Sequence, residues 1–121
     1  MENKYCTIND TFSANQMYVP VRRGVMCKSA KYNNWIKANI DIVRQMKKPE
    51  QYPIHIDILI LADSKWKQRH DTDNCIKPLV DLLVKAGVIP DDSTKYIESV
   101  QARHLMGFGK PVVTISYTEI N

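Results

Sequence analysis

The chain has 121 residues and a formal net charge of +4, and 44% of its residues are hydrophobic and 25% charged. These values are typical of one globular domain that folds without a metal or disulfide, so we expect a single domain over residues 1–121. The sequence also excludes a membrane-spanning protein, because no apolar stretch approaches the roughly 20 residues that cross a bilayer. The first residues lack the charged and then apolar pattern of a secretory signal, which favours a cytoplasmic location.

The three cysteines, Cys6, Cys27 and Cys75, have no Cys-x-x-Cys spacing. An odd number of cysteines without that spacing argues against both a disulfide framework and a zinc knuckle. The positive charge suits a polyanionic partner such as DNA, and a dimer would carry twice that charge. Many basic proteins bind no nucleic acid, so the charge alone is weak evidence.

The first half of the chain predicts two short strands, a helix and a long strand. Residues 5–8 and 17–21 favour strands, and the polar segment 9–15 between them favours a loop. Ser29 is suited to cap a helix that ends before Pro49. The apolar residues of this helix recur at steps of three and four: Tyr32, Ile36, Ile40, Val43 and Met46. Isoleucine at every second position from 54 to 60 predicts a strand with one buried face.

The second half predicts one more helix. Apolar residues between 73 and 85 lie on one helical face, and Gly87 stands where a left-handed cap would end the helix. Because proline is tolerated only in a first turn, Pro78 favours a regular helix that begins near Lys77, with residues 71–76 forming an irregular turn.

Strands are also predicted over residues 96–104 and 112–120. The short Gly- and Pro-containing segment between them predicts that they pair as a hairpin. The expected fold class is α+β, a mixed β-sheet with two covering α-helices.

Two aspartates separated by a single residue, Asp71 and Asp73, follow a run of basic residues. In extended backbone such residues project to the same side with Cα atoms about 6.5 Å apart, so both can bind one cation. Mg²⁺ accepts one or two carboxylates and completes its shell with water and phosphate oxygens. The structural alternative, which Asp-x-Asp alone would favour, is that one of them caps the following helix.

A second acidic pair, Asp91 and Asp92, follows that helix. A helix of about twelve residues rises roughly 18 Å, so the two pairs can lie at opposite ends of it, and only the return of the chain or a dimer partner would join them. An ordinary turn is the alternative for this pair. Lys77, one helical turn from Asp73, can stabilise charge on a phosphate, or be an exposed lysine in a weak ion pair.

Taken together these segments resemble the RusA family of Holliday junction resolvases. The resemblance rests on Arg69-His70-Asp71-Thr72-Asp73-Asn74, on Lys77, on Asp81-Leu82-Leu83-Val84-Lys85-Ala86-Gly87 and on Asp91-Asp92. Ser13-Ala14-Asn15 extends it toward the N-terminus, although Thr11-Phe12 replaces the prolines usual before that serine, so this loop receives no role.

The resemblance implies a homodimeric endodeoxyribonuclease that cuts branched DNA such as four-way junctions. It implies that Asp71, Asp73 and Asp92 bind Mg²⁺, for which Mn²⁺ can substitute, and that Lys77 assists catalysis. Whether Asp91 is also a ligand stays open. No Gly-rich phosphate loop is present, so we expect no nucleotide cofactor.

Two basic clusters are candidates for phosphate contact. We favour Lys65, Lys67 and Arg69, because they adjoin the acidic motif; for the cluster that contains Arg22 and Arg23, solvated surface charge is an equal alternative. The rival function is a noncatalytic, structure-selective DNA-binding module whose aspartates act as caps and turns. A nuclease of RNA or of simple flaps would use the same residues.

Overall fold

The computed structural model describes residues 3–69, 72–107 and 109–120, without the side chains of 67–69 and 72. A four-stranded sheet has the order β1-β6-β4-β5, and its strands are β1 (Tyr5–Asn9), β4 (Ile54–Ala62), β5 (Ile97–Met106) and β6 (Val112–Glu119). The strand β4 pairs parallel with β5 and antiparallel with β6, so the sheet is mixed. The predicted α+β class with a mixed sheet is therefore confirmed.

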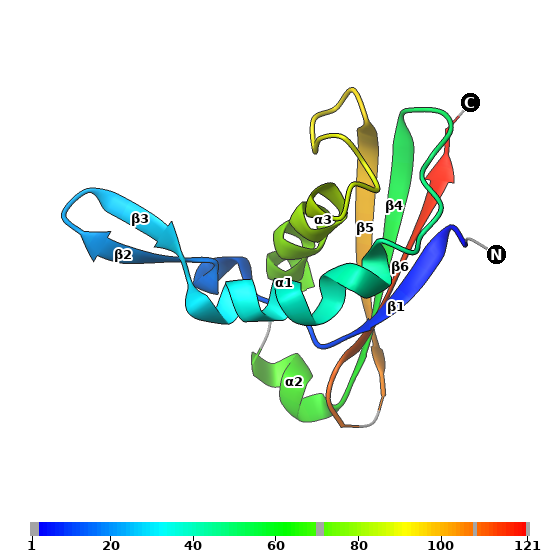
Figure 1. Cartoon of the computed structure of the whole chain (residues 1–121). Coiled ribbons are helices and arrows are strands. Elements are labelled where there is room, and N and C mark those ends of the chain that lie inside the picture. Colours follow the sequence, from blue (N-terminus) through cyan, green and yellow to red (C-terminus); the bar gives the residue numbers. More distant parts are fainter. Residues whose placement is uncertain (1–2, 70–71, 108, 121) are drawn as a thin grey trace.

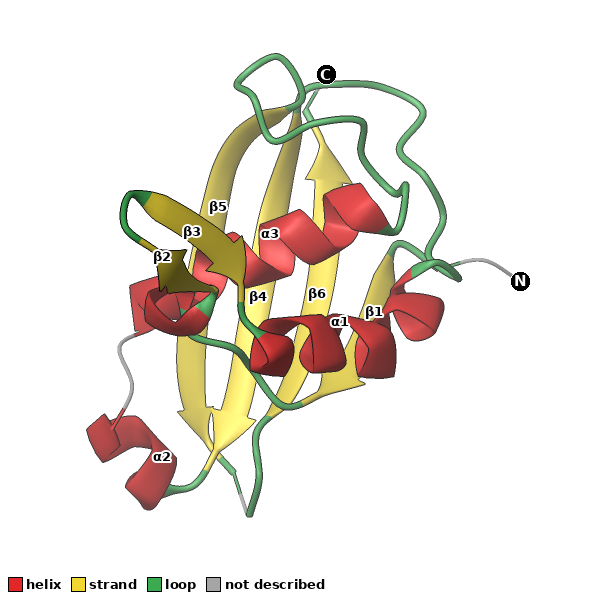
Figure 2. Cartoon of the chain, turned by 60° about the vertical axis from the view of Figure 1, so that its left-hand side comes forward, coloured by secondary structure: helices red, strands yellow, loops and turns green. Residues whose placement is uncertain are grey.

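Two helices, α1 (Ala30–Val43) and α3 (Ile76–Lys85), cover the same face of this sheet (Figure 2). A third, short helix, α2 (Ser64–Arg69), lies beyond one end of the sheet (Figure 1). Two 3₁₀ segments, η1 (Ala14–Gln16) and η2 (Thr72–Cys75), complete the helical elements of the described residues.

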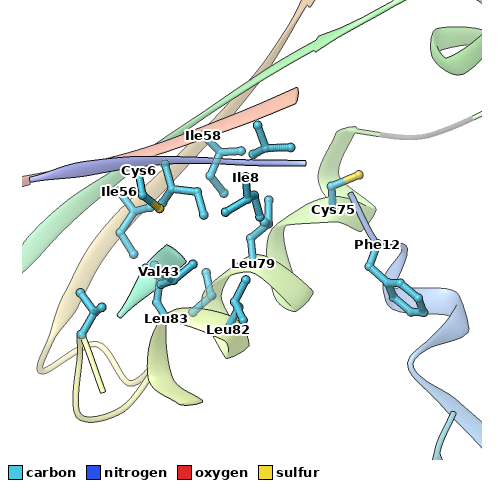
Figure 3. Packing of buried hydrophobic residues seen from close by; sticks show 14 of the residues in the cluster. Cys6, Ile8, Phe12, Val43, Ile56, Ile58, Cys75, Leu79, Leu82 and Leu83 are labelled. Carbon is cyan, nitrogen blue, oxygen red and sulfur yellow. The ribbon is translucent and has the colours of Figure 1, made fainter. Parts of the chain in front are cut away.

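The core lies between β4 and the two helices. Ile54, Ile56, Ile58 and Ile60 are at most 1% exposed, as their alternation predicts. Figure 3 shows Ile56 and Ile58 with the leucines of α3 in one cluster. This packing fixes α3 against the sheet and so positions the acidic motif at its start.

The predicted hairpin of the last two strands is wrong. Although β5 and β6 follow one another along the chain, β4 lies between them and pairs with both. The most apolar strand gains most from a central place, where both its edges are hydrogen bonded. The connection from β5 to β6 therefore crosses the end of β4, and the backbone N–H of Gly107 donates to the carbonyl of Ala62 over 2.9 Å.

A side chain at position 107 would crowd the crossing, because a Cβ there would lie 3.1 Å from the backbone N of Ala62 and from Leu61. We expect Gly107→Val to lower the free energy of unfolding by about 1–3 kcal/mol, as overpacking does. Urea titration followed by circular dichroism measures this change. Lys110→Val, an exposed position in the same loop, is the control and should stay within about 0.5 kcal/mol.

The start of α1 and both ends of α3 agree with the sequence prediction, whereas α1 ends at Val43 and Met46, which was expected within it, instead forms a β-bridge with Asn3. Ser29 Oγ accepts a hydrogen bond from the N–H of Tyr32 and so caps α1. The helix α3 begins at Ile76, which leaves Pro78 in its first turn, where no N–H is needed. Gly87 has a φ of 78° and ends α3 with the hydrogen bonds of a Schellman motif.

A second, two-stranded sheet was not fully predicted. The strand β2 (Tyr18–Arg22) agrees with the expected one, but β3 (Val25–Lys28) pairs with it as an antiparallel hairpin that projects from the body of the molecule (Figure 1). In the described part of the chain, no helix is long and apolar enough to span a bilayer.

Candidate active site

The acidic motif lies between α2 and α3. Asp73 is in η2 and its side chain is exposed, whereas Asp71 lies outside the described residues. The N-cap position of α3 is occupied by Cys75 and not by an aspartate. Asp73 therefore does not cap α3. The carboxylate of Asp73 is exposed, so a ligand from solvent can reach it.

Lys77 is the second residue of α3, and its side chain is 58% exposed. Its Nζ lies 3.7 Å from Oδ1 of Asp81, and the other carboxylate oxygen of Asp81 accepts a hydrogen bond of 3.3 Å from the hydroxyl of Tyr32. Tyr32 is fully buried, and this burial, followed by the charge of Asp81, raises the pKa of its hydroxyl. A buried tyrosine of α1 thus orients the carboxylate that holds Lys77.

Asp81 is a residue to which the sequence analysis gave no separate role. The spacing of four between Lys77 and Asp81 is the signal that could have found their contact, since residues four apart on a helix are neighbours. Tyr32 could not have been found in this way, because it lies 49 positions from Asp81 along the chain.

The second acidic pair lies at the other end of α3. Asp91 and Asp92 are exposed in the loop that follows this helix, and Oδ1 of Asp91 accepts a hydrogen bond from the N–H of Asp92. Because α3 has ten residues and so is about 15 Å long, Asp73 before it and Asp92 after it flank opposite ends of this helix along the chain. Within the described residues, no three acidic, histidine or cysteine side chains form a metal-binding group.

The predicted DNA-contacting residues lie on two elements. Lys65 is exposed on α2, while the side chains of Lys67 and Arg69 on the same helix lie outside the described part. Arg22 and Arg23 are exposed at the tip of the β2–β3 hairpin. The two groups are separate in sequence: the hairpin follows η1 along the chain, and α2 precedes η2.

A pair of lysines increases the positive charge near the hairpin. The neighbouring Lys28 lowers the pKa of Lys85, first through a side-chain hydrogen bond, and partial burial and charge repulsion by Lys28 add to this effect. A bound anion such as a phosphate would relieve this repulsion.

A polar hollow of about 460 Å³ lies beside the elements that hold Asp73. It is lined by the segment from Asp10 to Ser13, by Asn15 and Gln16, and by Trp66, and η1 itself contacts η2. Trp66 is 8% exposed and stacks on His104, with the ring centroids 5.3 Å apart. Its ring therefore packs within the protein rather than presenting a free face to a DNA base.

The comparison with protein families decides the affiliation of this chain. The family model described as endodeoxyribonuclease RusA matches residues 8–116. The chain belongs to the RusA endodeoxyribonuclease family. It is also similar to the crossover junction endodeoxyribonuclease RusA of Aquifex aeolicus (strain VF5), with 32% identity over 78 residues. That alignment covers 63% of this chain and 60% of the relative, less than two thirds of the relative's length.

The match to the RusA family spans both acidic pairs, Lys77 and the β2–β3 hairpin. The resemblance inferred from the acidic motifs is thus confirmed at the level of the family.

Proposed function

We propose that this chain is a Mg²⁺-dependent endodeoxyribonuclease that resolves Holliday junctions and related branched DNA by paired strand cuts, in DNA recombination and repair. The observation that carries the proposal is the RusA family match, which includes the Asp-x-Asp-Asn motif, Lys77 and the Asp91–Asp92 pair. An exposed Asp73 that does not cap α3 supports a role in binding rather than in folding.

The donor set fits a hard divalent cation. Asp71, Asp73 and Asp92 provide carboxylate oxygens, which Mg²⁺ and Mn²⁺ prefer. In the proposal these three residues bind Mg²⁺, and the ion supplies Lewis-acid activation of the attacking water and neutralises charge on the phosphate. Lys77 adds a positive charge at the same end of α3 that stabilises the phosphate as its negative charge increases.

We further propose that the working unit is a homodimer. Asp73 and Asp92 of one chain lie at opposite ends of the ten-residue α3, so a complete ligand set requires Asp71 and Asp73 of one subunit and Asp92 of the partner subunit. A dimer with two-fold symmetry would then have two such sites, and the approximate two-fold symmetry of a four-way junction would present one strand to each.

Phosphate contacts would come from the basic residues beside these sites. Lys65, Lys67 and Arg69 on α2 and Arg22 and Arg23 on the hairpin carry the positive charge that binds the DNA backbone. Such contacts position the DNA but read no sequence, which suits recognition of a branched shape.

Lys77→Ala is expected to reduce the single-turnover cutting rate on the order of 10²-fold, the effect of losing one well-placed charge in a transition state. Junction affinity should change little, because one lysine is a small part of the phosphate-contacting surface. Rapid-quench cutting and gel-shift titration on the same labelled junction measure both. Lys47→Ala, which removes a half-buried lysine from a comparable ion pair with Glu50, is the control. An unchanged cutting rate would show that Lys77 has no part in the reaction.

The rival, a noncatalytic module that binds branched DNA, is favoured by the separation of Asp73 and Asp92 within one chain. Incubation of the protein with a labelled four-way junction and a matched linear duplex separates the two functions. We expect cutting of the junction in Mg²⁺ or Mn²⁺, and binding with little cutting in Ca²⁺, which accepts a looser shell. Equal cutting in EDTA and Mg²⁺ would refute the metal mechanism, and binding without cutting in any metal would favour the rival.

A further inference from the structure

The β2–β3 hairpin is exposed along its whole length. All nine residues of its two strands are exposed, and five of them are large and apolar: Tyr18, Val19, Val21, Val25 and Met26. A two-stranded hairpin is at best marginally stable alone in water, and exposed apolar clusters mark interaction sites. This arm therefore has a surface suited to bury against another molecule.

Within the hairpin, the most exposed apolar side chains are near the tip. Val21 is 61% and Met26 60% exposed. The strand register shifts between Pro20 and Arg22, so Val21 is the extra residue of a bulge, which bends the strand and turns this side chain away from the ladder. Gly24, with a φ of 75°, closes the turn next to Arg23. The tip thus combines two projecting apolar groups with two guanidinium groups.

The charge of the arm identifies the kind of partner. Residues 17–31 contain four basic residues, Arg22, Arg23, Lys28 and Lys31, and no acidic one. Repulsion between like charges opposes docking of this arm on the same arm of a second copy. Nucleic acid offers the matching combination, because phosphates pair with the arginines and base faces accept the apolar side chains.

The base of the arm adjoins the proposed active site. Ser29 joins the two ends of the hairpin, since its Oγ donates to the carbonyl of Gln16 and its N–H donates to that of Met17. Gln16 belongs to η1, which contacts η2 and hence the segment with Asp73. Strands of four to five residues extend the tip roughly 15 Å from this base.

We propose that the β2–β3 hairpin is a wedge that enters the branch point of the DNA, with Val21 and Met26 inserted against unstacked bases and Arg22 and Arg23 on the flanking phosphates. This inference rests on the proposed function and specifies how a branched substrate is recognised. Base pairs at a branch point lack continuous stacking, so an apolar side chain parts them at lower cost than in a duplex. The wedge would discriminate a junction from linear DNA without reading sequence.

The test replaces the apolar surface while preserving its shape. Val21→Thr/Met26→Gln retains β-branching and chain length but makes both side chains polar, and Val21→Ile/Met26→Leu is the matched apolar control. Each protein is bound in Ca²⁺ to a four-way junction with 2-aminopurine at the branch point, whose fluorescence rises when the base unstacks. We expect a rise with the parental protein and the apolar control, and little rise with the polar variant.

Cutting in Mg²⁺ provides a second measurement. The polar variant should cut a fully paired junction about tenfold more slowly than the parent, the loss expected when an apolar side chain is no longer buried. It should cut a junction with two unpaired bases at the branch point at nearly the parental rate, because those bases need no parting. This rescue would not follow from a merely misfolded arm.

Two results would overturn the wedge. The first is an equal fluorescence rise with the polar variant and the parent. The second is a polar variant that sediments as a monomer while the parent is a dimer, which would assign the arm to a contact between subunits. If the parental protein cuts no DNA, the proposed function fails, whereas the fluorescence still decides whether the arm unstacks bases.

Discussion

Asp73→Asn should abolish junction cutting while the protein stays folded. Asparagine preserves the shape of the side chain but lacks the charge that a hard cation requires. The loss should exceed the ~10–100-fold effect of removing a group that only supports a metal ligand. Stability should change little, because Asp73 is exposed and does not occupy the N-cap of α3. Junction affinity should hold or increase, since one negative charge that faces the phosphates is removed.

The measurements for this variant are single-turnover cutting, gel-shift affinity and thermal unfolding on one preparation. Asp41→Asn is the matched control, because Asp41 is exposed on α1 and its replacement removes the same charge far from η2. If net charge alone governed cutting, the two variants would behave alike. A folded Asp73→Asn protein that resolves junctions at the parental rate would remove Asp73 from the site.

Mixed dimers of Asp73→Asn and Asp92→Asn should regain nicking that neither variant has alone. If each site combines Asp73 of one subunit with Asp92 of the other, a mixed dimer has one site with both aspartates and one site with neither. With random exchange half of the dimers are mixed, so about one quarter of the parental number of sites is restored. The product should be singly nicked junctions, because paired cuts need two intact sites.

The experiment is done by unfolding and refolding the two variants together and comparing the mixture with each variant refolded alone. A parental sample taken through the same procedure gives the full number of sites. If the mixture stays as inactive as its components, no intact site forms between subunits, and Asp73 and Asp92 would have to act within one chain.

Periodic burial explains which elements could be predicted. The strand β4 has isoleucine at every second position from 54 to 60, and α1 and α3 have apolar residues at helical spacing. The apolar pattern of each element therefore predicts its secondary structure directly. The irregular start of α3 followed from Pro78 and its end from Gly87. These are local signals, set by the residues of the element itself.

The order of the strands could not be predicted from the residues of each strand alone. Adjacency along the chain favoured a hairpin of β5 and β6, but the insertion of β4 between them depends on pairing with residues 43 to 65 positions away. The strand β3 was missed for another reason. All its residues are exposed, so no alternation of buried and exposed side chains marks it. The candidate site was likewise predicted as residue types and spacings, while the contact of Tyr32 with Asp81 required the packing of α1 against α3.

The central proposal is that a dimer of this chain makes paired, Mg²⁺-dependent cuts at a DNA branch. The most direct measurement uses a supercoiled plasmid that extrudes a cruciform, beside a plasmid of the same length without the inverted repeat. We expect linear product from the cruciform plasmid in Mg²⁺, with ends that map to the cruciform, and no product in EDTA. Equal cutting of both plasmids, or linear product in EDTA, would refute the proposal.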